Sequence, residues 1–369
     1  MQFNQQRMLD RLVEMIKIDS ISFEEKEMSD YLEKYWTDRG LEVYRDQAGV
    51  KFGGNGSNIL IHIPGTMPGE AICYNAHQDT VEPGRGIQPV LEGILLRSSG
   101  DTILGADDKS GIAMLMEAYE VLQETKTPHR EMYFLFTICE EQNMHGSKNF
   151  DMTKLPCKSI YSLDGAGSLG NVSTAGPAKD GIKVTFKGRK AHAGIEPEKG
   201  INAAVMLAKA ISQVKFGRID KETTSNVGRI SGGDMTNVVT DEAFFTAEVR
   251  SHSPKKLNEQ IELIRQASYN AAQEMGGEAI VTVSHDYPSI KTDFDSFLYK
   301  KIVEVYQKEG FEIKQVISGG GGDSNIFAGY GFICGGISTG MNDVHSSKET
   351  LDLTVWMQAM RLLYRSMTE

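Results

Sequence analysis

Short apolar runs recur along the first half of the chain, and each of them ends in side chains that can bind a metal or carry a proton. These runs are Ile72–Ala76 before His77 and Asp79, Glu131–Cys139 before Glu140 and Glu141, and Ser159–Leu163 before Asp164. Unbroken apolar runs of this length are typical of parallel strands that are buried on both faces. The pattern therefore predicts a central parallel sheet with polar side chains at the ends of its strands.

Apolar residues at helical spacing lie between and around these runs. The predicted helices are an N-terminal amphipathic helix over 9–16, helices over 24–39, 112–122 and 294–309, and a final helix after Glu349. Residues 81–101 are expected to form a long loop. Strands alternating with helices predict an α/β domain.

A different order of elements begins at Gly181. Strands over 182–186, 225–230, 243–250 and 279–284 and helices over 201–214 and 257–275 follow in the order β-α-β-β-α-β. This order is the ferredoxin-like unit, which closes into one sheet backed by two helices. We therefore expect a catalytic domain formed by residues 1–178 and 289–369, with a second domain inserted over residues 179–288.

The size and charge of the chain limit the number of domains and the kinds of partner that we expect. Its 369 residues, 40% of them hydrophobic, are enough for two domains, and the net charge of −11 argues against nucleic acid or an anionic membrane as a partner. The 4 cysteines lack CxxC spacing, which predicts buried thiols in a reducing compartment. No run reaches the length of a membrane span. These features predict a soluble cytoplasmic protein.

The polar side chains at the strand ends are the candidate site, because ligands in open α/β sheets bind outside the carboxyl ends of the strands. His77 followed by Asp79 is, taken alone, more often a hydrogen-bonded pair than a metal site. Asp107 and Asp108 begin a predicted helix, where aspartates are also common as capping residues. His345 lies in a polar loop before the last helix and has no evident structural role.

Counted together, the candidates suit two divalent ions that share one carboxylate. The candidate ligands are His77, Asp107, Glu141, Asp164 and His345. Asp79 and Glu140 are candidate supporting residues that do not bind the metals themselves. Zinc fits this mixed nitrogen and oxygen set best, with cobalt or manganese as alternatives.

The run Gly319–Gly322 lacks the Gly-Lys-Ser/Thr ending of a phosphate loop. We interpret the run as glycines that let the backbone of a substrate approach the chain closely, with Gly321 as the contact. A plain turn is nearly as well supported.

The motifs that contain these residues resemble those of the M20 family of metallopeptidases, most closely its peptidase T-like branch. They are Asn75–Thr80, Gly105–Gly111, Glu140–Glu141 followed by Gly146–Ser147, Ser162–Gly165 and Val344–Ser346. The resemblance covers the whole chain in the family's order. It implies a mixed-sheet catalytic domain of the zinc-exopeptidase type with an inserted ferredoxin-like lid and dimerisation domain.

The resemblance also implies a role for each residue of the candidate metal site. Asp107 would bridge the two metals and be followed by a cis peptide bond. His77 and Asp164 would bind one metal, and Glu141 and His345 the other. Asp79 would orient His77, and Glu140 would be the general base.

In the inserted domain, Gly188–Gly194 resembles the family's lid motif. Its His192 would reach the scissile carbonyl, and in dimeric members this histidine comes from the partner subunit. Asn237 and Arg250 resemble contacts to the substrate carboxylate, although Arg250 on its own is equally consistent with an ion pair at a strand end.

The implied activity is an aminopeptidase that removes the N-terminal residue of short peptides such as tripeptides. The alternative is an amidohydrolase, deacylase or carboxypeptidase acting on N-acyl amino acids or dipeptides. The implied assembly is a homodimer through the lid domain, with a monomer as the alternative.

Overall fold

The computed structural model describes residues 3–369 and divides into two compact units. The first unit contains the chain up to Thr174 together with Thr292–Ile317 and Gly322–Glu369, and the second contains Ala175–Lys291 and Ser318–Gly321. The second unit is thus an insertion in the first. The range 179–288 expected for the inserted domain lies within it.

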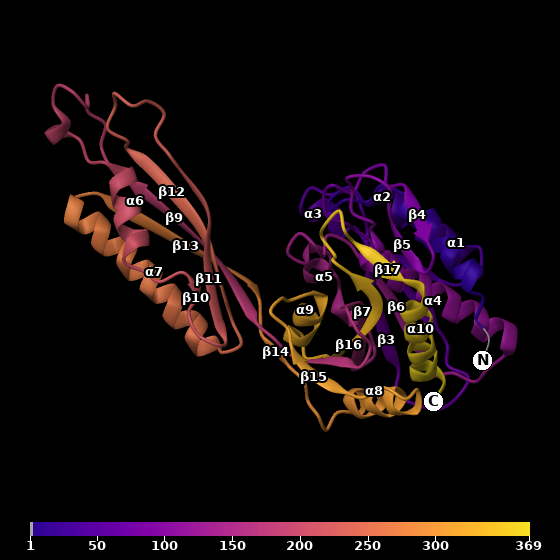
Figure 1. The fold of residues 1–369 in the computed structure, drawn as a ribbon. Helices are drawn as coiled ribbons and strands as arrows, with labels where there is room; N and C mark the ends of the chain where they lie inside the picture. The colour runs from indigo at the N-terminus through magenta and orange to yellow at the C-terminus, as the bar shows by residue number, and fades with distance from the viewer. Residues whose placement is uncertain (1–2) are drawn as a thin grey trace. The chain divides into compact units, whose positions relative to one another are not determined.

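The first unit is built on a nine-stranded mixed sheet (Figure 1). In spatial order its strands are β1 (Val43–Arg45), β2 (Ile59–Ile63), β6 (Met132–Thr137), β3 (Ile72–His77), β7 (Ser159–Ala166), β16 (Ile333–Asn342), β17 (Thr350–Asp352), β5 (Leu95–Ser98) and β4 (Pro89–Glu92). The central strands β6, β3, β7 and β16 are parallel, and the outer pairs are antiparallel. The carboxyl ends of the central strands therefore meet at one edge of the sheet.

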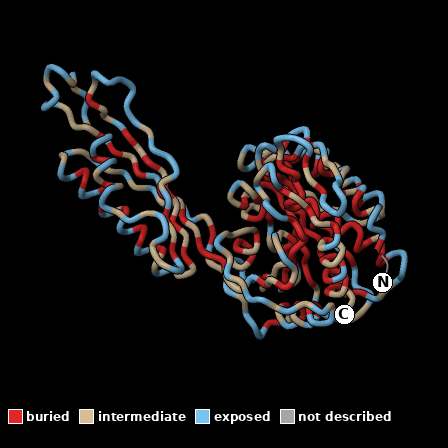
Figure 2. The backbone as a smooth tube through the Cα atoms, in the orientation of Figure 1, coloured by how far each residue is buried: buried red, intermediate tan, exposed pale blue. Residues whose placement is uncertain are grey.

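Large side chains fill the centre of this sheet. Tyr74 of β3 is in register with Phe134 of β6 and with Tyr161 of β7, and all three are buried. The rings of Tyr74 and Tyr161 stack with their centroids 5.8 Å apart. The Tyr74 hydroxyl is 3.0 Å from Oγ of Ser366, so the buried phenol keeps a hydrogen-bond partner. Figure 2 shows that buried residues are concentrated in the middle of this unit.

Helices cover both faces of the sheet. In Figure 1 the long helices α4 and α10 lie on one side of the central strands and the short helices α5 and α9 on the other. The helices are α1 (Gln5–Ile16), α2 (Lys26–Thr37), α3 (Ala48–Lys51), α4 (Ala106–Thr125), α5 (His145–Asn149), the 3₁₀ turn η1 (Met152–Lys154), α8 (Phe297–Lys308), α9 (Asp323–Gly329) and α10 (Leu353–Thr368). Helix α4 is buried along most of its length, as expected for a helix packed between the sheet and its neighbours.

The second unit has the predicted β-α-β-β-α-β order, with one additional two-residue strand, β10, before β11. Its elements are β9 (Ala178–Lys187), the 3₁₀ turn η2 (Pro197–Lys199), α6 (Ala203–Ser212), β10 (Gly217–Arg218), β11 (Thr223–Gly232), β12 (Glu242–Ser251), α7 (Pro254–Met275) and β13 (Glu278–Tyr287). The antiparallel sheet has the order β10-β11-β12-β9-β13. Buried and less buried residues alternate along β12, so one face packs on helices. The predicted fold class, a mixed α/β domain with a ferredoxin-like insert, is confirmed.

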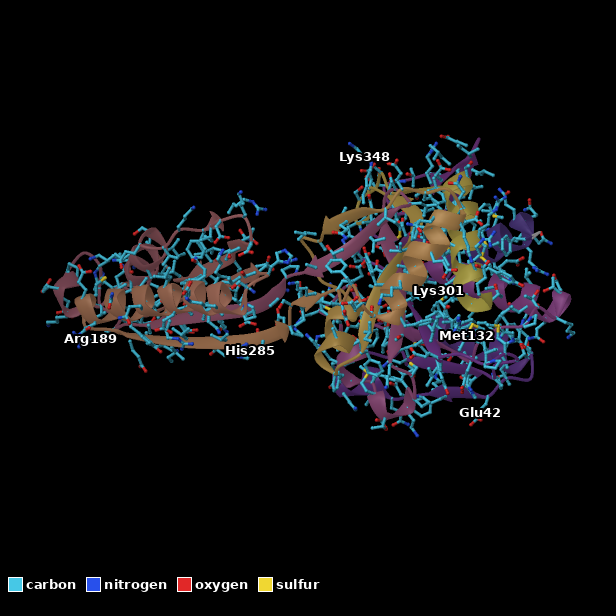
Figure 3. All side chains as sticks on the ribbon, turned by 90° about the horizontal axis from the view of Figure 1, so that it is seen from below. Glu42, Met132, Arg189, His285, Lys301 and Lys348 are labelled. Atoms are coloured by element: carbon cyan, nitrogen blue, oxygen red, sulfur yellow. The ribbon has the colours of Figure 1, made fainter. Side chains whose placement is uncertain are left out.

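Three further short strands belong to neither of these two sheets. The strands β14 (Ile290–Lys291), β8 (Asn171–Gly176) and β15 (Lys314–Ile317) form a separate three-stranded sheet. Figure 3 shows the side chains of the whole described chain, with Arg189 and His285 labelled in the second unit and the buried Met132 in the first.

One prediction about the first unit was wrong. Residues 81–101, expected to be a loop, contain the hairpin formed by β4 and β5. Leu96 of β5 pairs with Leu351 of β17, far along the chain. The hairpin therefore depends on a partner strand that its local sequence does not indicate.

Candidate active site

The predicted site residues of the first unit meet at the carboxyl edge of the central strands. Register pairs His77, the last residue of β3, with Thr137, the last residue of β6, and pairs Asn75 of β3 with Ser162 of β7. Glu140 and Glu141 follow shortly after Thr137, and Asp164 lies two residues beyond Ser162. Parallel strands in this register bring their terminal side chains together, as the sequence predicts.

The first candidate metal group contains His77, Asp107 and Asp164. One ligand atom of each lies within 4.8 Å of the ligand atoms of the other two. His77 Nε2 is 3.1 Å from Asp107 Oδ1, and both side chains are buried. The peptide bond between Asp107 and Asp108 is cis, as the family resemblance implies.

The second candidate metal group contains Asp107, Glu141 and His345, again with ligand atoms within 4.8 Å of one another. His345 Nε2 is 3.2 Å from Asp107 Oδ2 and 2.7 Å from Glu141 Oε1. Asp107 therefore belongs to both groups, with Oδ1 toward His77 and Oδ2 toward His345. A third set that meets the same distance limit, His77 with Glu140 and Glu141, spans the two groups.

Acidic side chains dominate the electrostatics of this cluster. Burial raises the pKa of Asp164 well above its ordinary value, and the negative charges of Asp107 and Glu140 raise it further. Burial also raises the pKa of Glu140, although His77 acts against this shift. For Asp107, burial is outweighed by hydrogen bonds from His345 and His77, which hold its pKa well below the ordinary value. Carboxylates crowded in this way are stabilised by added positive charge.

Asp79 holds several parts of the site together. Its Oδ1 accepts the backbone N–H of Glu140 at 2.9 Å, and its Oδ2 accepts the N–H of Glu141 at 3.2 Å and the hydroxyl of Ser22 at 2.7 Å. His77 Nδ1 lies 3.0 Å from the backbone carbonyl of Asp79 and 3.5 Å from its Oδ1. The Asp79 carboxylate thus positions the Glu140–Glu141 segment, and its carbonyl is the nearer partner of the imidazole.

The structure adds residues that the sequence pattern did not single out. A Cβ placed on Gly322 would lie 3.0 Å from Glu140 Oε1 and 3.4 Å from Asp164 Oδ2, so this glycine packs against the acidic cluster. The buried carboxylate of Asp323 accepts the hydroxyls of Thr137 and Ser147, each at 2.5 Å. Gly322 is the last glycine of the run and Asp323 is the residue after it, so the glycine run itself was the available signal.

His192 and Asn237 lie on neighbouring loops of the second unit. The N–H of Ala193 donates to the carbonyl of Asn237 at 3.0 Å, and His192 forms a bridge with Val238. The side chains of His192 and Asn237 are exposed. The two residues with implied substrate contacts are therefore neighbours within this unit.

Arg250 and Gly321 lie at one end of the sheet of the second unit. Arg250 Nε donates to Glu248 Oε1 at 2.9 Å, which is the ion pair considered as the alternative role. Arg250 of β12 and Tyr287 of β13 both pair with Lys179 of β9. A Cβ on Gly321 would lie 2.3 Å from the Tyr287 ring, so only glycine fits this contact without a rearrangement.

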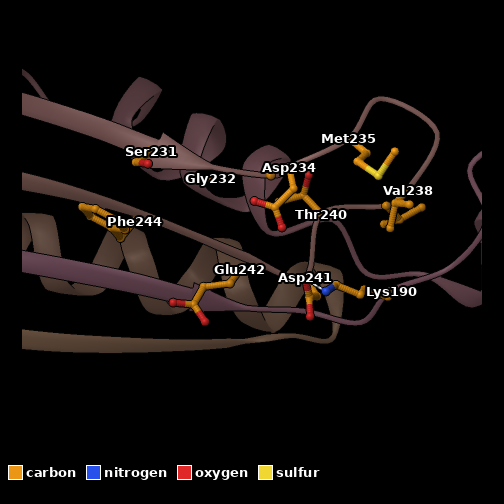
Figure 4. A pocket seen from close by; sticks show the side chains of 12 residues that line it. Lys190, Ser231, Gly232, Asp234, Met235, Val238, Thr240, Asp241, Glu242 and Phe244 are labelled. Atoms are coloured by element: carbon orange, nitrogen blue, oxygen red, sulfur yellow. Dashed lines mark ion pairs between the residues drawn. The ribbon is translucent and has the colours of Figure 1, made fainter.

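The second unit also has a cavity of about 490 Å³ beside the loop that carries Asn237 (Figure 4). It is lined by Lys190, Ser231, Gly232, Gly233, Asp234, Met235, Val238, Val239, Thr240, Asp241, Glu242 and Phe244. Lys190 Nζ is 3.5 Å from Asp241 Oδ1 at its rim. Its lining mixes charged, hydroxyl and apolar side chains.

Known proteins share this fold over its whole length. A family model described as a peptidase dimerisation domain matches residues 179–275. The aminopeptidase PepT from Bacillus cereus ATCC 10987 is 35% identical, with a TM-score of 0.90 over 99% of this chain and 98% of that chain. A tripeptidase from Staphylococcus aureus is 30% identical, with a TM-score of 0.93 over the same 99% and 98%. The chain belongs to the M20 peptidases, in their peptidase T-like branch.

Membership of the M20 peptidases makes the protein an enzyme that hydrolyses peptide bonds. The uncharacterised protein YqjE of Bacillus subtilis strain 168 is 37% identical over 355 residues, which cover 95% of this chain and 94% of that protein.

Among residues 3–369, no helix is long and apolar enough to cross a membrane.

Proposed function

We propose that this M20 peptidase is a two-metal aminopeptidase that releases the N-terminal residue of short peptides, tripeptides among them. The observation that carries the proposal is Asp107, whose two oxygens face His77 in one group and His345 in the other. The aminopeptidase and the tripeptidase that share the fold at 35% and 30% identity support the choice of substrate.

The residues of the site fit two divalent ions. Each group offers one imidazole and two carboxylates, with the Asp107 carboxylate common to both. The pKa of Asp164 and that of Glu140 are raised, first by burial and then by neighbouring acids, so bound cations would relieve this repulsion. His77 and Asp164 would hold one ion, and Glu141 and His345 the other. Mixed nitrogen and oxygen ligands favour Zn²⁺, with Co²⁺ or Mn²⁺ as alternatives.

The chemistry divides between the ions and the protein. Divalent ions, when bound, lower the pKa of water and polarise a peptide carbonyl. Glu140 is buried at the edge of the cluster and serves as the general base that takes a proton from the attacking water. Glu140 then returns this proton to the leaving amine. Asp79, through the N–H groups of Glu140 and Glu141, keeps the base and one ligand in place.

The second unit supplies the substrate contacts in this proposal. His192 would stabilise the oxyanion, and Asn237, Arg250 and Gly321 would contact the peptide. The match of residues 179–275 to a peptidase dimerisation domain supports a homodimer formed through this unit. In such a dimer His192 would act on the partner's substrate.

The substrate is tested with one tripeptide in free, N-acetylated and C-amidated forms, using protein loaded with Zn²⁺ or Co²⁺. An aminopeptidase loses activity on the acetylated peptide. A further loss on the amidated peptide supports a carboxylate contact at Arg250. A preference for the acetylated form would overturn the aminopeptidase proposal in favour of a deacylase or carboxypeptidase.

The general base is tested by Glu140→Gln, with Glu131→Gln at the opposite end of β6 as the matched control. Glu140→Gln keeps the size of the side chain but removes the basic oxygen, so turnover should fall by about 10²-fold or more while metal binding persists. Glu131→Gln should behave as wild type. Full activity of Glu140→Gln would show that another group accepts the proton.

A further inference from the structure

Glu349 makes an unusual set of contacts next to the candidate metal centre. Its side chain is buried, with 1% exposed, and its carboxylate accepts three backbone N–H groups. Oε2 accepts from Leu104 at 2.8 Å and from Gly105 at 2.9 Å, and Oε1 accepts from Asp107 at 3.1 Å. Both oxygens of one buried carboxylate are therefore used to hold the segment that leads into Asp107.

This segment is the start of helix α4, where backbone donors lack partners within the helix. Gly105 is the N-cap residue, with φ of 75°, and having no side chain it cannot cap the helix itself. The side chain of Glu349, 244 residues away in sequence from Gly105, caps the helix instead. Without the Glu349 carboxylate, the buried N–H groups of Leu104, Gly105 and Asp107 would lose their acceptor.

The loop that carries Glu349 also carries His345. His345 Nε2 contacts Asp107 Oδ2 at 3.2 Å, while Glu349 accepts the Asp107 N–H. The N–H of Glu349 donates to the carbonyl of Ser346 at 3.1 Å, which closes the loop between them. One loop thus holds Asp107 by its side chain and by its backbone.

We propose that Glu349 is a positioning residue that sets the geometry of Asp107 for both metal groups without binding an ion itself. The inference rests on the proposed two-metal function. A carboxylate suits this role better than an amide, because it offers an acceptor oxygen on both branches, one toward Leu104 and Gly105 and one toward Asp107. Residues that support metal ligands in this way affect metal affinity by about 10- to 100-fold.

The test compares Glu349→Gln with Asp46→Asn, which removes the same charge elsewhere in the first unit. The Asp46 carboxylate also holds a loop, since it accepts the N–H of Ala48 at 3.0 Å and the N–H and side-chain amide of Asn58 at 2.9 and 2.8 Å. Metal-free full-length protein is titrated with Co²⁺ by calorimetry, and the visible absorption of bound Co²⁺ is recorded. The thermal midpoint of each variant is measured in parallel.

We expect Glu349→Gln to weaken Co²⁺ binding by about 10- to 100-fold and to alter the Co²⁺ spectrum. Asp46→Asn should lower the thermal midpoint but keep the wild-type affinity and spectrum. The shorter Glu349→Asp, which keeps the charge but cannot span both sides of the segment, should weaken binding as well and replaces Glu349→Gln if that variant does not fold.

Wild-type affinity and spectrum in the Glu349 variants would overturn the inference, as would an equal loss of affinity in Asp46→Asn. Either result leaves the two-metal function standing, because wild-type protein still binds its ions. Failure of the wild-type protein to bind two Co²⁺ ions would instead refute the proposed function.

Discussion

Replacing Gly322 with alanine adds one methyl group against the acidic cluster. The new Cβ would lie 3.0 Å from Glu140 Oε1, about 0.4 Å closer than the 3.4 Å at which ordinary contact begins. The backbone of Gly322, with φ of −147°, suits any residue, so the side-chain contact is the only source of strain. A displacement of about 1 Å at a catalytic group can cost about 10²-fold in rate, so a shift of about 0.4 Å corresponds to about 6-fold in kcat, or about 1 kcal/mol.

The assay is steady-state hydrolysis of a tripeptide, with kcat and KM determined separately. Gly320→Ala is the matched control from the same glycine run, because its Cβ would meet no atom within 4 Å. Gly321→Ala should act differently from both, by lowering stability, since its Cβ would clash with Tyr287 at 2.3 Å. If Gly322→Ala kept the wild-type kcat, or if Gly320→Ala lost as much, the packing of this loop against Glu140 would not be what positions the base.

Further predictions concern metal, pH and the core. Treatment with a chelator should abolish hydrolysis and lower the thermal midpoint, and Zn²⁺ should restore both, because ligands that bind only the folded state stabilise it; hydrolysis that survives chelation would contradict the metal proposal. Burial alone would raise the pKa of Glu120, but hydrogen bonds from Arg39 and Tyr35 hold it below its ordinary 4.5. The stabilisation from the ionised Glu120 is therefore present above about pH 4.5 and is lost on acidification, so in urea unfolding Glu120→Gln should lose less stability than wild type between pH 5 and pH 3. The exposed Glu27→Gln should follow wild type, and identical acid profiles for all three proteins would refute the assignment. Trp36→Ala should cost about 3–5 kcal/mol in unfolding free energy, because the ring is fully buried; a cost below about 1 kcal/mol would show that the core refills the space.

The sequence predicted the sheet, and the candidate residues that meet at its edge, for a physical reason. Strands buried on both faces need continuous apolar runs, so β3, β6 and β7 are visible locally. Parallel strands end at one edge, so the residues after them, from His77 to Asp164, meet without any knowledge of the loops. The ferredoxin-like order of the second unit was visible in the same way, because each of its elements has its own period.

Contacts between distant segments could not be read from local patterns. The hairpin of β4 and β5 forms within residues 81–101 because β17 lies beside it. Asp323 reaches Thr137 and Ser147 only through the packing of α9 against the sheet. Hydrogen bonds of this kind carry no periodic signal, since a single polar residue can make them from any loop.

The sequence by itself determined which side chains line the carboxyl edge, because burial and strand direction leave a local trace. Only the tertiary structure decided how they are held. The Asp79 carboxylate supports Glu140 and Glu141, and Glu349 supports the segment before Asp107. Buried backbone donors must find acceptors wherever the fold supplies them, and that choice is made by the packed structure as a whole.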